Sequence, residues 1–254
     1  MNLILFKNKQ DSYTLPRNDR RYRHIREILR SIPGETLKVG VLDGPVGEAH
    51  IRVFDEERIE LDARWHGAMP APPAPVTILL GHPRPPVLKR LWRDLSSLGV
   101  RKIRVFTGEL GERSYLTSSA WDDPDYYLLE GLSQGGHTRP PQLTRHARLA
   151  EAIAAHGTGN THETDTRTGE ARFFGTLGAG DALSLREMLT GEMEFDAVTL
   201  CIGPERGLTD DEELLLRRNG YCPVSLGPRT LRTETATVLL AGAACSVCSV
   251  SSGT

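Results

Sequence analysis

The first 68 residues contain several short apolar segments, of which 36–42 and 48–54 alternate with the two-residue period of β-strands, and one helical pattern interrupts them. Alternation of this kind buries one face of a strand and leaves the other in solvent. Residues 19–30 instead predict a helix with Ile25, Ile28 and Leu29 on one apolar face at helical spacing. Several short strands with one helix predict a small β-barrel. The predicted strands are 3–6, 36–42, 48–54 and 58–64.

A proline-rich segment, residues 69–75, separates this part from the rest of the chain. Proline lacks the backbone N–H that pairs strands, and proline-rich segments stay extended, so the segment marks a domain boundary. We therefore expect one domain over residues 1–70 and another over residues 74–254.

Beyond this boundary the apolar runs are continuous, which is typical of strands buried in a parallel sheet. Residues 76–80 and 103–106 are such runs, and the amphipathic range 87–98 between them predicts a βαβ unit. Thr209 is the expected N-cap of a helix, because acidic residues fill positions 210–213, where the helix dipole favours them. The second domain is therefore predicted to be α/β. Its further predicted elements are strands at 197–202 and 221–226 and helices at 209–219 and 234–250.

The composition of the 254-residue chain is that of an ordinary globular protein, with 39% hydrophobic and 25% charged residues. The apolar run at the N-terminus is too short for a signal peptide, and no run reaches the length of a membrane span. We therefore expect a cytoplasmic protein without a membrane partner. Residues 156–170 are polar and rich in Gly and Thr, which indicates a mobile loop or a hairpin.

Two of the four cysteines, Cys245 and Cys248, have the spacing of a redox or metal motif. No second pair and no nearby histidine completes a zinc site, so we expect no metal. The favoured interpretation is that both thiols are buried on an apolar C-terminal helix. The other two cysteines are Cys201 and Cys222.

The formal net charge of −2 does not describe a basic nucleic-acid binder, but arginines crowd into one short stretch. Only Asp19 and Glu27 oppose them there. A guanidinium presents a planar fork of donors that matches phosphate. The stretch is therefore either a solvated helix face or an RNA contact. Its members are Arg17, Arg20, Arg21, Arg23, Arg26 and Arg30.

Two glycine-proline loops follow predicted strands in the last quarter of the chain. The first reads GPERGL over residues 203–208, and the second reads LGPRTLRTET over residues 226–235. Glycine lets the backbone approach a ligand closely, and open α/β sheets bind ligands where the carboxyl ends of their strands meet the following loops. The two loops are therefore the predicted ligand site.

The sequences GPERGLTDDE and SLGPRTLRTETA resemble the signature of the 16S ribosomal RNA uridine methyltransferases of the RsmE type, which belong to the SPOUT class. The stretch HIREILRSIPGETLKVGVLDG resembles the N-terminal PUA-like RNA-binding barrel of that family. The resemblance implies a PUA-like β-barrel followed by a SPOUT α/β domain with a trefoil knot. It also implies a homodimer, S-adenosyl-L-methionine as methyl donor and small-subunit ribosomal RNA as partner.

The chain departs from the family pattern at a few positions. Arg206 stands where the family usually has glycine, and His137 where an arginine is usual. The loop over 82–84 reads His-Pro-Arg in place of a lysine-bearing loop. The departures at His137 and over 82–84 fall on surfaces that would contact RNA, so they bear on the RNA target more than on the cofactor, whereas Arg206 stands in a predicted cofactor loop.

The resemblance also implies which residues act. The implied reaction is methylation of the uridine ring nitrogen between the two carbonyls, and Arg232 is the candidate for stabilising the negative charge that would develop there. Glu234 would orient Arg232 or accept the proton. Thr233 is also a candidate N-cap, with Glu234 favoured by the helix dipole. Arg113 and Gln134 are candidates for RNA contact. The cofactor-binding candidates are Leu177, Gly178, Gly203, Pro204, Glu205, Gly207, Leu226, Gly227 and Leu231.

Three alternatives stay open at this stage. The first is a methyltransferase of the same fold with another RNA target, the second is an RNA-binding module that has lost catalysis, and the third is a nucleotide-binding α/β protein. The last lacks a phosphate-loop fingerprint. The non-catalytic alternative gains if the side chain of Arg206 fills the cofactor site.

Overall fold

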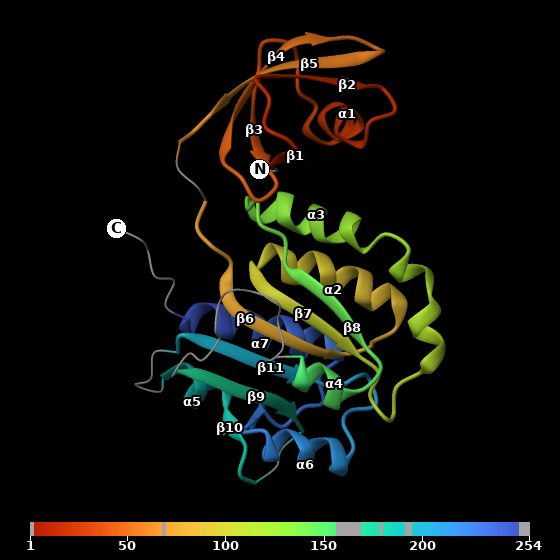
Figure 1. Cartoon of the computed structure of the whole chain (residues 1–254), viewed down its shortest axis with the longest axis vertical. Coiled ribbons are helices and arrows are strands. Elements are labelled where there is room, and N and C mark those ends of the chain that lie inside the picture. The colour runs from red at the N-terminus through yellow and green to blue at the C-terminus, as the bar shows by residue number, and fades with distance from the viewer. Residues whose placement is uncertain (1–2, 68–69, 156–168, 178–179, 191–194, 249–254) are drawn as a thin grey trace. The chain divides into compact units, whose positions relative to one another are not determined.

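The computed structural model describes residues 3–67, 70–155, 169–177, 180–190 and 195–248. The chain forms two compact units (Figure 1). One unit consists of Met1–Pro72 with Leu132–Pro140, and the other of Pro73–Gly131 with Pro141–Thr254.

The first unit is a curled five-stranded sheet in the order β1-β3-β4-β5-β2. All neighbours are antiparallel except β1 and β3, which run parallel. The expected alternation is present, because Leu37, Val39, Ile51 and Leu61 are among the side chains that form the buried core. The strands are β1 (Ile4–Phe6), β2 (Ser12–Pro16), β3 (Thr36–Val41), β4 (Val46–Phe54) and β5 (Arg58–Trp65). The mixed sheet confirms the predicted barrel-like half of the fold.

The helical segment of this unit differs from the expectation. Only α1 (Arg20–Arg23) is α-helical, and η1 (His24–Leu29) is a π-helix that ends at Arg30 with a left-handed φ of 54°. Ile25 is fully buried, but Ile28 is 66% exposed, so the prediction that it shares a buried face with Ile25 was wrong. The wider i→i+5 turn moves residue i+3 away from the face that a regular helix would give it.

Residues 132–140 pack within the first unit. Leu3 N–H donates to the carbonyl of Ser133 over 3.0 Å, and the hydroxyl of Thr138 donates to the carbonyl of Gly44 over 2.8 Å. A Cβ on Gly40 would lie 2.7 Å from the Thr138 methyl group, so only glycine fits without a shift.

The second unit contains a seven-stranded sheet in the order β10-β12-β9-β11-β6-β7-β8, and every neighbouring pair in it is parallel. The α/β prediction is therefore confirmed. Three of its strands, β8, β9 and β10, were not predicted, because β8 and β9 mix charged and apolar residues and β10 is only two residues long. The strands are β6 (Ala74–Gly81), β7 (Val100–Phe106), β8 (Gln142–His146), β9 (Glu170–Thr176), β10 (Leu183–Ser184), β11 (Ala197–Ile202) and β12 (Cys222–Ser225).

Helices cover both faces of this sheet (Figure 1). One face packs against α2 and α7 and includes Trp92 and Leu240 in its core. The other face packs against α4 and α6 through residues such as Leu149 and Leu216. The helices are α2 (Pro85–Ser97), α3 (Pro124–Gly135), α4 (Leu149–Ala154), α5 (Leu185–Thr190), α6 (Asp210–Arg218) and α7 (Thr233–Val247), and the 3₁₀ turns are η2 (Arg113–Thr117) and η3 (Ser119–Trp121).

The two predicted helix caps have opposite outcomes. Thr209 caps α6, and its side chain accepts from Glu212 N–H in a complete capping box. Thr233 is not a cap, because it is the first helical residue of α7 and the N-cap is Arg232, whose backbone is extended. Residues 156–168 of the expected mobile loop at 156–170 lie outside the described residues. Its last position, Glu170, is the first residue of β9. The trefoil knot stays a prediction.

No helix among the described residues is long and apolar enough to cross a membrane.

Candidate functional site

The two glycine-proline loops leave the same edge of the parallel sheet. The first follows β11 and the second follows β12, and β9 lies between these strands. The loops after β6 and β7 lie at this edge too, because all four strands run parallel. The structure therefore brings the predicted cofactor loops to one side of the sheet, where α/β folds bind ligands (Figure 1).

The loop after β11 packs tightly against the end of β6. A Cβ on Gly81 would lie 2.4 Å from the backbone nitrogen of Pro204, so no side chain fits between the two segments. Gly207 closes the loop with a φ of 79°, and its N–H donates to the carbonyl of Pro204 over 2.8 Å. A Cβ on Gly203 would lie about 3 Å from the backbone of Gly207 and Leu208. Glycine is therefore required here by the shape of the loop.

Glu205 links this loop to the loop after β6. Its Oε1 accepts a hydrogen bond from Arg84 N–H over 2.7 Å, and the Arg84 Nε lies 3.8 Å from the same oxygen. The sequence interpretation placed Glu205 among the cofactor-binding residues. Its carboxylate here joins two loops of the candidate site, which adds a positioning role to that expectation.

Glu212 was not singled out from the sequence, although it is a buried carboxylate beside the site. Its Oε2 accepts from Thr209 N–H and its Oε1 from Glu109 N–H, each over 3.0 Å. Glu109 in turn accepts from the hydroxyl of Thr209 over 3.0 Å. Glu212 thereby fixes the loop after β7 to the start of α6. The signal that would have found it is the capping-box spacing of Thr209 and Glu212.

The loop after β12 has mostly local contacts. Gly227 has a φ of 107°, and its N–H donates to the hydroxyl of Ser225 over 3.2 Å. A Cβ on Gly227 would meet nothing within 4 Å, so open space adjoins this backbone. Leu226 and Leu231 are half-buried on either side. Leu177 follows β9 at the same edge and is 71% exposed, whereas Gly178 lies outside the described residues.

Arg232 and Glu234 stand at the start of α7. The side chain of Arg232 is exposed and makes no hydrogen bond or ion pair with the residues that the structure describes, while its backbone carbonyl accepts from Ala236 N–H over 3.0 Å. Glu234 is half-buried, and its Oε1 lies 3.7 Å from Nη2 of Arg90 on α2. The carboxylate of Glu234 therefore has a cationic partner other than Arg232 in this structure.

Arg206, the position that departs from the family glycine, is exposed in the loop after β11. Its side chain is not packed inside the loop. The position of Arg206 therefore gives no support to the alternative of a non-catalytic RNA-binding module.

His82, at the start of the loop after β6, is a structural residue. It is buried, and its Nε2 accepts from Trp121 Nε1–H over 2.9 Å. Since Trp only donates, the proton is on Nδ1, which donates to the carbonyl of Pro83 over 2.7 Å. Burial lowers the pKa of His82 below its ordinary value, so the ring is neutral and holds the loop in place.

The arginine cluster of the first unit has more positive than negative charge, because only Asp19 and Glu27 accompany its six arginines. Arg21 binds Asp19 with two hydrogen bonds, of 2.6 and 3.0 Å, and covers the ring of Phe6 at 4.8 Å. The remaining five arginines of the cluster are exposed. Of the other RNA-contact candidates, Arg113 is exposed in η2 and Gln134 is exposed in α3. The six-arginine stretch therefore presents an excess of positive charge to solvent.

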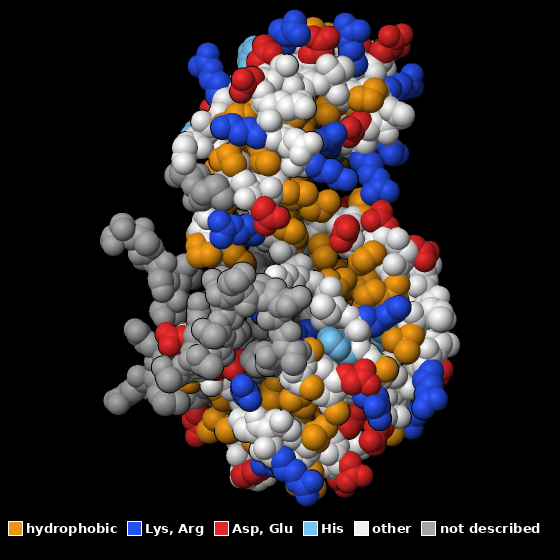
Figure 2. All heavy atoms as spheres, in the orientation of Figure 1, with side chains coloured by type: hydrophobic (Ala, Val, Ile, Leu, Met, Phe, Trp, Pro, Cys, Tyr) orange, Lys and Arg blue, Asp and Glu red, His pale blue; other side chains and the backbone are white. Residues whose placement is uncertain are grey.

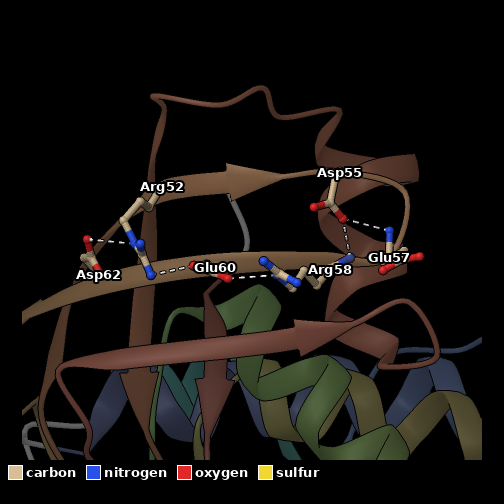
Figure 3. Close-up of polar contacts among 6 residues, drawn as sticks. All are labelled: Arg52, Asp55, Glu57, Arg58, Glu60 and Asp62. Atoms are coloured by element: carbon tan, nitrogen blue, oxygen red, sulfur yellow. Dashed lines mark hydrogen bonds and ion pairs between the residues drawn. The ribbon is translucent and has the colours of Figure 1, made fainter.

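Other arginines of the first unit already have acidic partners, as Figure 3 shows on β4 and β5. Arg58 donates to Glu60 over 2.8 Å, and Arg52 pairs with both Glu60 and Asp62. These pairs balance their own charges. The outer surface of β4 and β5 is therefore a weaker candidate for phosphate contact than the arginine cluster.

The remaining chemical groups of the second unit do not add to the site. Burial raises the pKa of Cys245 to about 12 and that of Cys248 to about 11, which makes both thiols unreactive. No three His, Cys, Asp or Glu side chains gather as a metal site within the described ranges. A hollow of about 420 Å³ lies at the amino end of β12, beside the ion pair of Arg217 and Asp181, and hence away from the glycine loops.

Comparison with known proteins identifies the family. Residues 70–245 match the family model of the RNA methyltransferase domain. The chain belongs to this family. It is 32% identical to Ribosomal RNA small subunit methyltransferase E of Treponema pallidum over 98% of this chain and 90% of that protein. It is 28% identical to Ribosomal RNA small subunit methyltransferase E 1 of Borreliella burgdorferi over 94% of both.

The fold of this RNA methyltransferase is shared with a solved structure. The crystal structure of a Ribosomal RNA small subunit methyltransferase E from Neisseria gonorrhoeae, bound to S-adenosyl methionine, matches with a TM-score of 0.76 and 19% identity. The match covers 98% of each chain. Both units of the methyltransferase therefore belong to the common architecture, and both glycine-proline loops fall inside the range that matches the family model.

Proposed function

We propose that this methyltransferase transfers a methyl group from S-adenosyl-L-methionine to ring nitrogen 3 of a uridine in small-subunit ribosomal RNA. The observation that carries the proposal is the meeting of the loops after β11, β9 and β12 at one edge of the sheet. The 32% identity to a ribosomal RNA small subunit methyltransferase over nearly the whole chain supports the substrate class.

The loops fit an S-adenosyl-L-methionine molecule chemically. The backbone at Gly207 and Gly227 has left-handed φ values, and a Cβ at either would meet nothing within 4 Å. The N–H groups of both glycines are bonded within their own loops, so the glycines would let the donor come close to the loop backbone, and Leu226 and Leu231 would cover the adenine face. The remaining proposed cofactor residues are Leu177, Gly178, Gly203, Pro204 and Glu205. When bound, the donor supplies a methyl group on a positively charged sulfur.

The protein's own part in the reaction is to remove the proton of the uracil ring and to stabilise the negative charge that then develops on it. The target nitrogen lies between two carbonyls and carries a proton at neutral pH, so negative charge develops on the carbonyl oxygens as that proton leaves. The exposed guanidinium of Arg232, at the edge of the proposed donor site, would stabilise this charge. Glu234 would accept the proton or orient a neighbouring group. The base would be turned out of its stack to reach the site.

The two parts of the chain have separate proposed tasks. Residues 1–70 bind RNA through the arginine cluster, and residues 74–254 form the methyltransferase domain. We also propose a homodimer formed through α7, in a protein that works in the cytoplasm. On α7, Thr235, Leu239 and Ser246 are exposed, and no charged residue follows Glu234 in the helix. An uncharged exposed helix face of this kind is suited to packing against a second copy.

Calorimetric titration with S-adenosyl-L-methionine tests the cofactor. Wild type is expected to bind in the micromolar range, and Arg232→Ala to bind equally well, because Arg232 acts on the RNA. Absence of binding by the wild type would contradict the proposal and favour a non-catalytic RNA-binding module. Donor binding combined with methylation of another RNA would retain the chemistry and correct the target.

A further inference from the structure

An open hollow of about 280 Å³ lies in the first unit, outside the proposed donor site. It is formed where the end of η1 faces the turn between β4 and β5. This volume is just below the range of about 300–1,000 Å³ that drug-sized ligands occupy, so a single ring system is the appropriate scale of ligand. Its lining residues are Arg26, Ser31, Pro33, Phe54, Asp55 and Glu56.

The hollow has preorganised walls. The hydroxyl of the buried Tyr22 donates to the carbonyl of Asp55 over 2.8 Å and accepts from Nη1 of Arg26 over 2.6 Å. Phe54 packs edge-on against the Tyr22 ring, with ring centroids 6.1 Å apart. Tyr22 therefore fixes the guanidinium on one side and the aromatic ring on the other.

The acidic side of the hollow is fixed by the turn itself, as Figure 3 shows. Asp55 Oδ1 accepts from the N–H groups of Glu57 and Arg58, each over 2.8 Å, which leaves Oδ2 without a hydrogen-bond partner in the described part of the chain. These two backbone bonds lower the pKa of Asp55, so the free oxygen is a carboxylate acceptor at neutral pH. Glu56 adds a second exposed carboxylate.

The backbone that leads to the hollow is unusual. A π-helix ends in Arg30, a long side chain in the left-handed region. Both features are costly and are frequent at functional sites. The same segment exposes Ile28 at 66% and Ile32 at 60% of their surface. Exposed apolar side chains among arginines offer contact to a ligand that is both flat and anionic.

We propose that this hollow binds one unstacked nucleotide of single-stranded RNA whose base carries an exocyclic amino group. The ring of Phe54 and Pro33 would contact the base face, Arg26 the base or its phosphate, and the carboxylates of Asp55 and Glu56 the amino group. Proteins recognise unpaired RNA bases by this combination of stacking and edge contacts. The inference rests on the proposed RNA substrate and deepens it, because it names a base-reading contact away from the methylated uridine.

Binding of short fluorescent oligonucleotides, either all cytidine or all uridine, tests the proposal. Wild type is expected to prefer the cytidine oligonucleotide, because cytosine presents an amino group where uracil presents a carbonyl. Phe54→Leu keeps an apolar side chain but removes the stacking face, so it is expected to weaken cytidine binding roughly 5- to 150-fold. Glu56→Gln is expected to reduce the preference for cytidine.

Arg26→Gln and Arg52→Gln form a matched pair, since each removes one exposed guanidinium from the same unit. Arg26 lines the hollow, and Arg52 lies on the β4 surface that Figure 3 shows, paired with Glu60 and Asp62. Arg26→Gln is expected to lose several times more affinity than Arg52→Gln. Because its side chain is exposed, Arg26→Gln also gives a result if Phe54→Leu fails to fold.

Equal losses for Arg26→Gln and Arg52→Gln, or wild-type affinity for Phe54→Leu, would overturn the proposed hollow. Equal affinity of the wild type for the two oligonucleotides would overturn its base preference. Calorimetry with S-adenosyl-L-methionine and methyl transfer by the wild type test the proposed function separately. If the wild type binds the donor and methylates RNA, but the hollow variants do not change oligonucleotide binding, only the inference about the hollow is contradicted.

Discussion

At the scale of single residues, two carboxylates hold the loops of the proposed donor site. Glu205 connects the loop after β11 to Arg84 N–H, and Glu212 connects α6 to Glu109 N–H. Neither bond depends on bound ligand. The loop after β11 is therefore positioned before the donor arrives, which lowers the ordering cost of binding. The loop after β12 has a local hydrogen bond through Ser225 instead.

Glu212→Ala is expected to destabilise the protein by about 1–3 kcal/mol, because it leaves two backbone N–H groups without their acceptor. Asp211→Ala is the matched control. Asp211 is exposed in the first turn of the same helix, and its loss costs only about 0.3–1 kcal/mol of dipole interaction. Urea unfolding of both variants gives the comparison. Equal losses of unfolding free energy in the two variants would show that the buried hydrogen bonds of Glu212 contribute nothing beyond the interaction of its charge with the helix dipole.

Gly227→Ala is expected to weaken donor binding, since a Cβ at a φ of 107° costs about 1–2 kcal/mol and moves the loop after β12. Gly67→Ala serves as control, because a Cβ there meets no atom within 4 Å and φ is not positive. Calorimetric titration compares the two variants. Unchanged donor affinity in Gly227→Ala would argue that this loop does not line the donor site.

The neutral state of His82 predicts a pH dependence of stability. Its pKa in the folded protein is lowered, so the unfolded chain takes up the proton more readily. The contribution of His82 to stability is complete above the ordinary histidine pKa of about 6.5 and is lost as pH falls below it. His82→Gln is expected to flatten the fall in unfolding free energy below about pH 6.5. An unchanged slope would contradict a buried neutral ring.

At the scale of elements, the success of sequence interpretation followed the strength of local signals. Strands β6 and β11 were predicted because each is apolar apart from one threonine, and α6 because Thr209 and its acidic first turn mark a start. Strand β9 was missed, since its register depends on pairing with β11 and β12. The π-helix was missed for a related reason, because residues 24–29 have a regular helical pattern whose i→i+5 bonding is set by packing.

The end of the π-helix gives an element-scale prediction. Arg30→Gly removes a Cβ from a left-handed position, so it is expected to stabilise the fold by about 1 kcal/mol. Thermal unfolding of Arg30→Gly and of Arg23→Gly makes the comparison, because Arg23 is helical and its replacement by glycine is expected to destabilise by about 1 kcal/mol. Destabilisation by both variants would mean that the Arg30 side chain contributes more than its backbone costs.

At the scale of the whole molecule, the resemblance to a known family predicted more residues of the candidate site than the hydrophobic and glycine patterns did. Glycine spacing alone predicted ligand loops after β11 and β12, and the parallel sheet places both loops at one edge. The partners of Glu234 and Glu212 lie on α2 and in the loop after β7, far away in the sequence. No local rule predicts such contacts, so the packing roles of these carboxylates required the structure.

Detection of the methylated nucleoside tests the central claim most directly. Purified small-subunit ribosomal RNA that lacks the modification is incubated with the protein and S-adenosyl-L-methionine, and its nucleosides are analysed by mass spectrometry. The account predicts 3-methyluridine at one position with wild type, and a loss of roughly 10²–10³ in rate with Arg232→Ala, as for removal of one charge-stabilising donor. Methyl transfer to a different atom or base, or none despite donor binding, would contradict it.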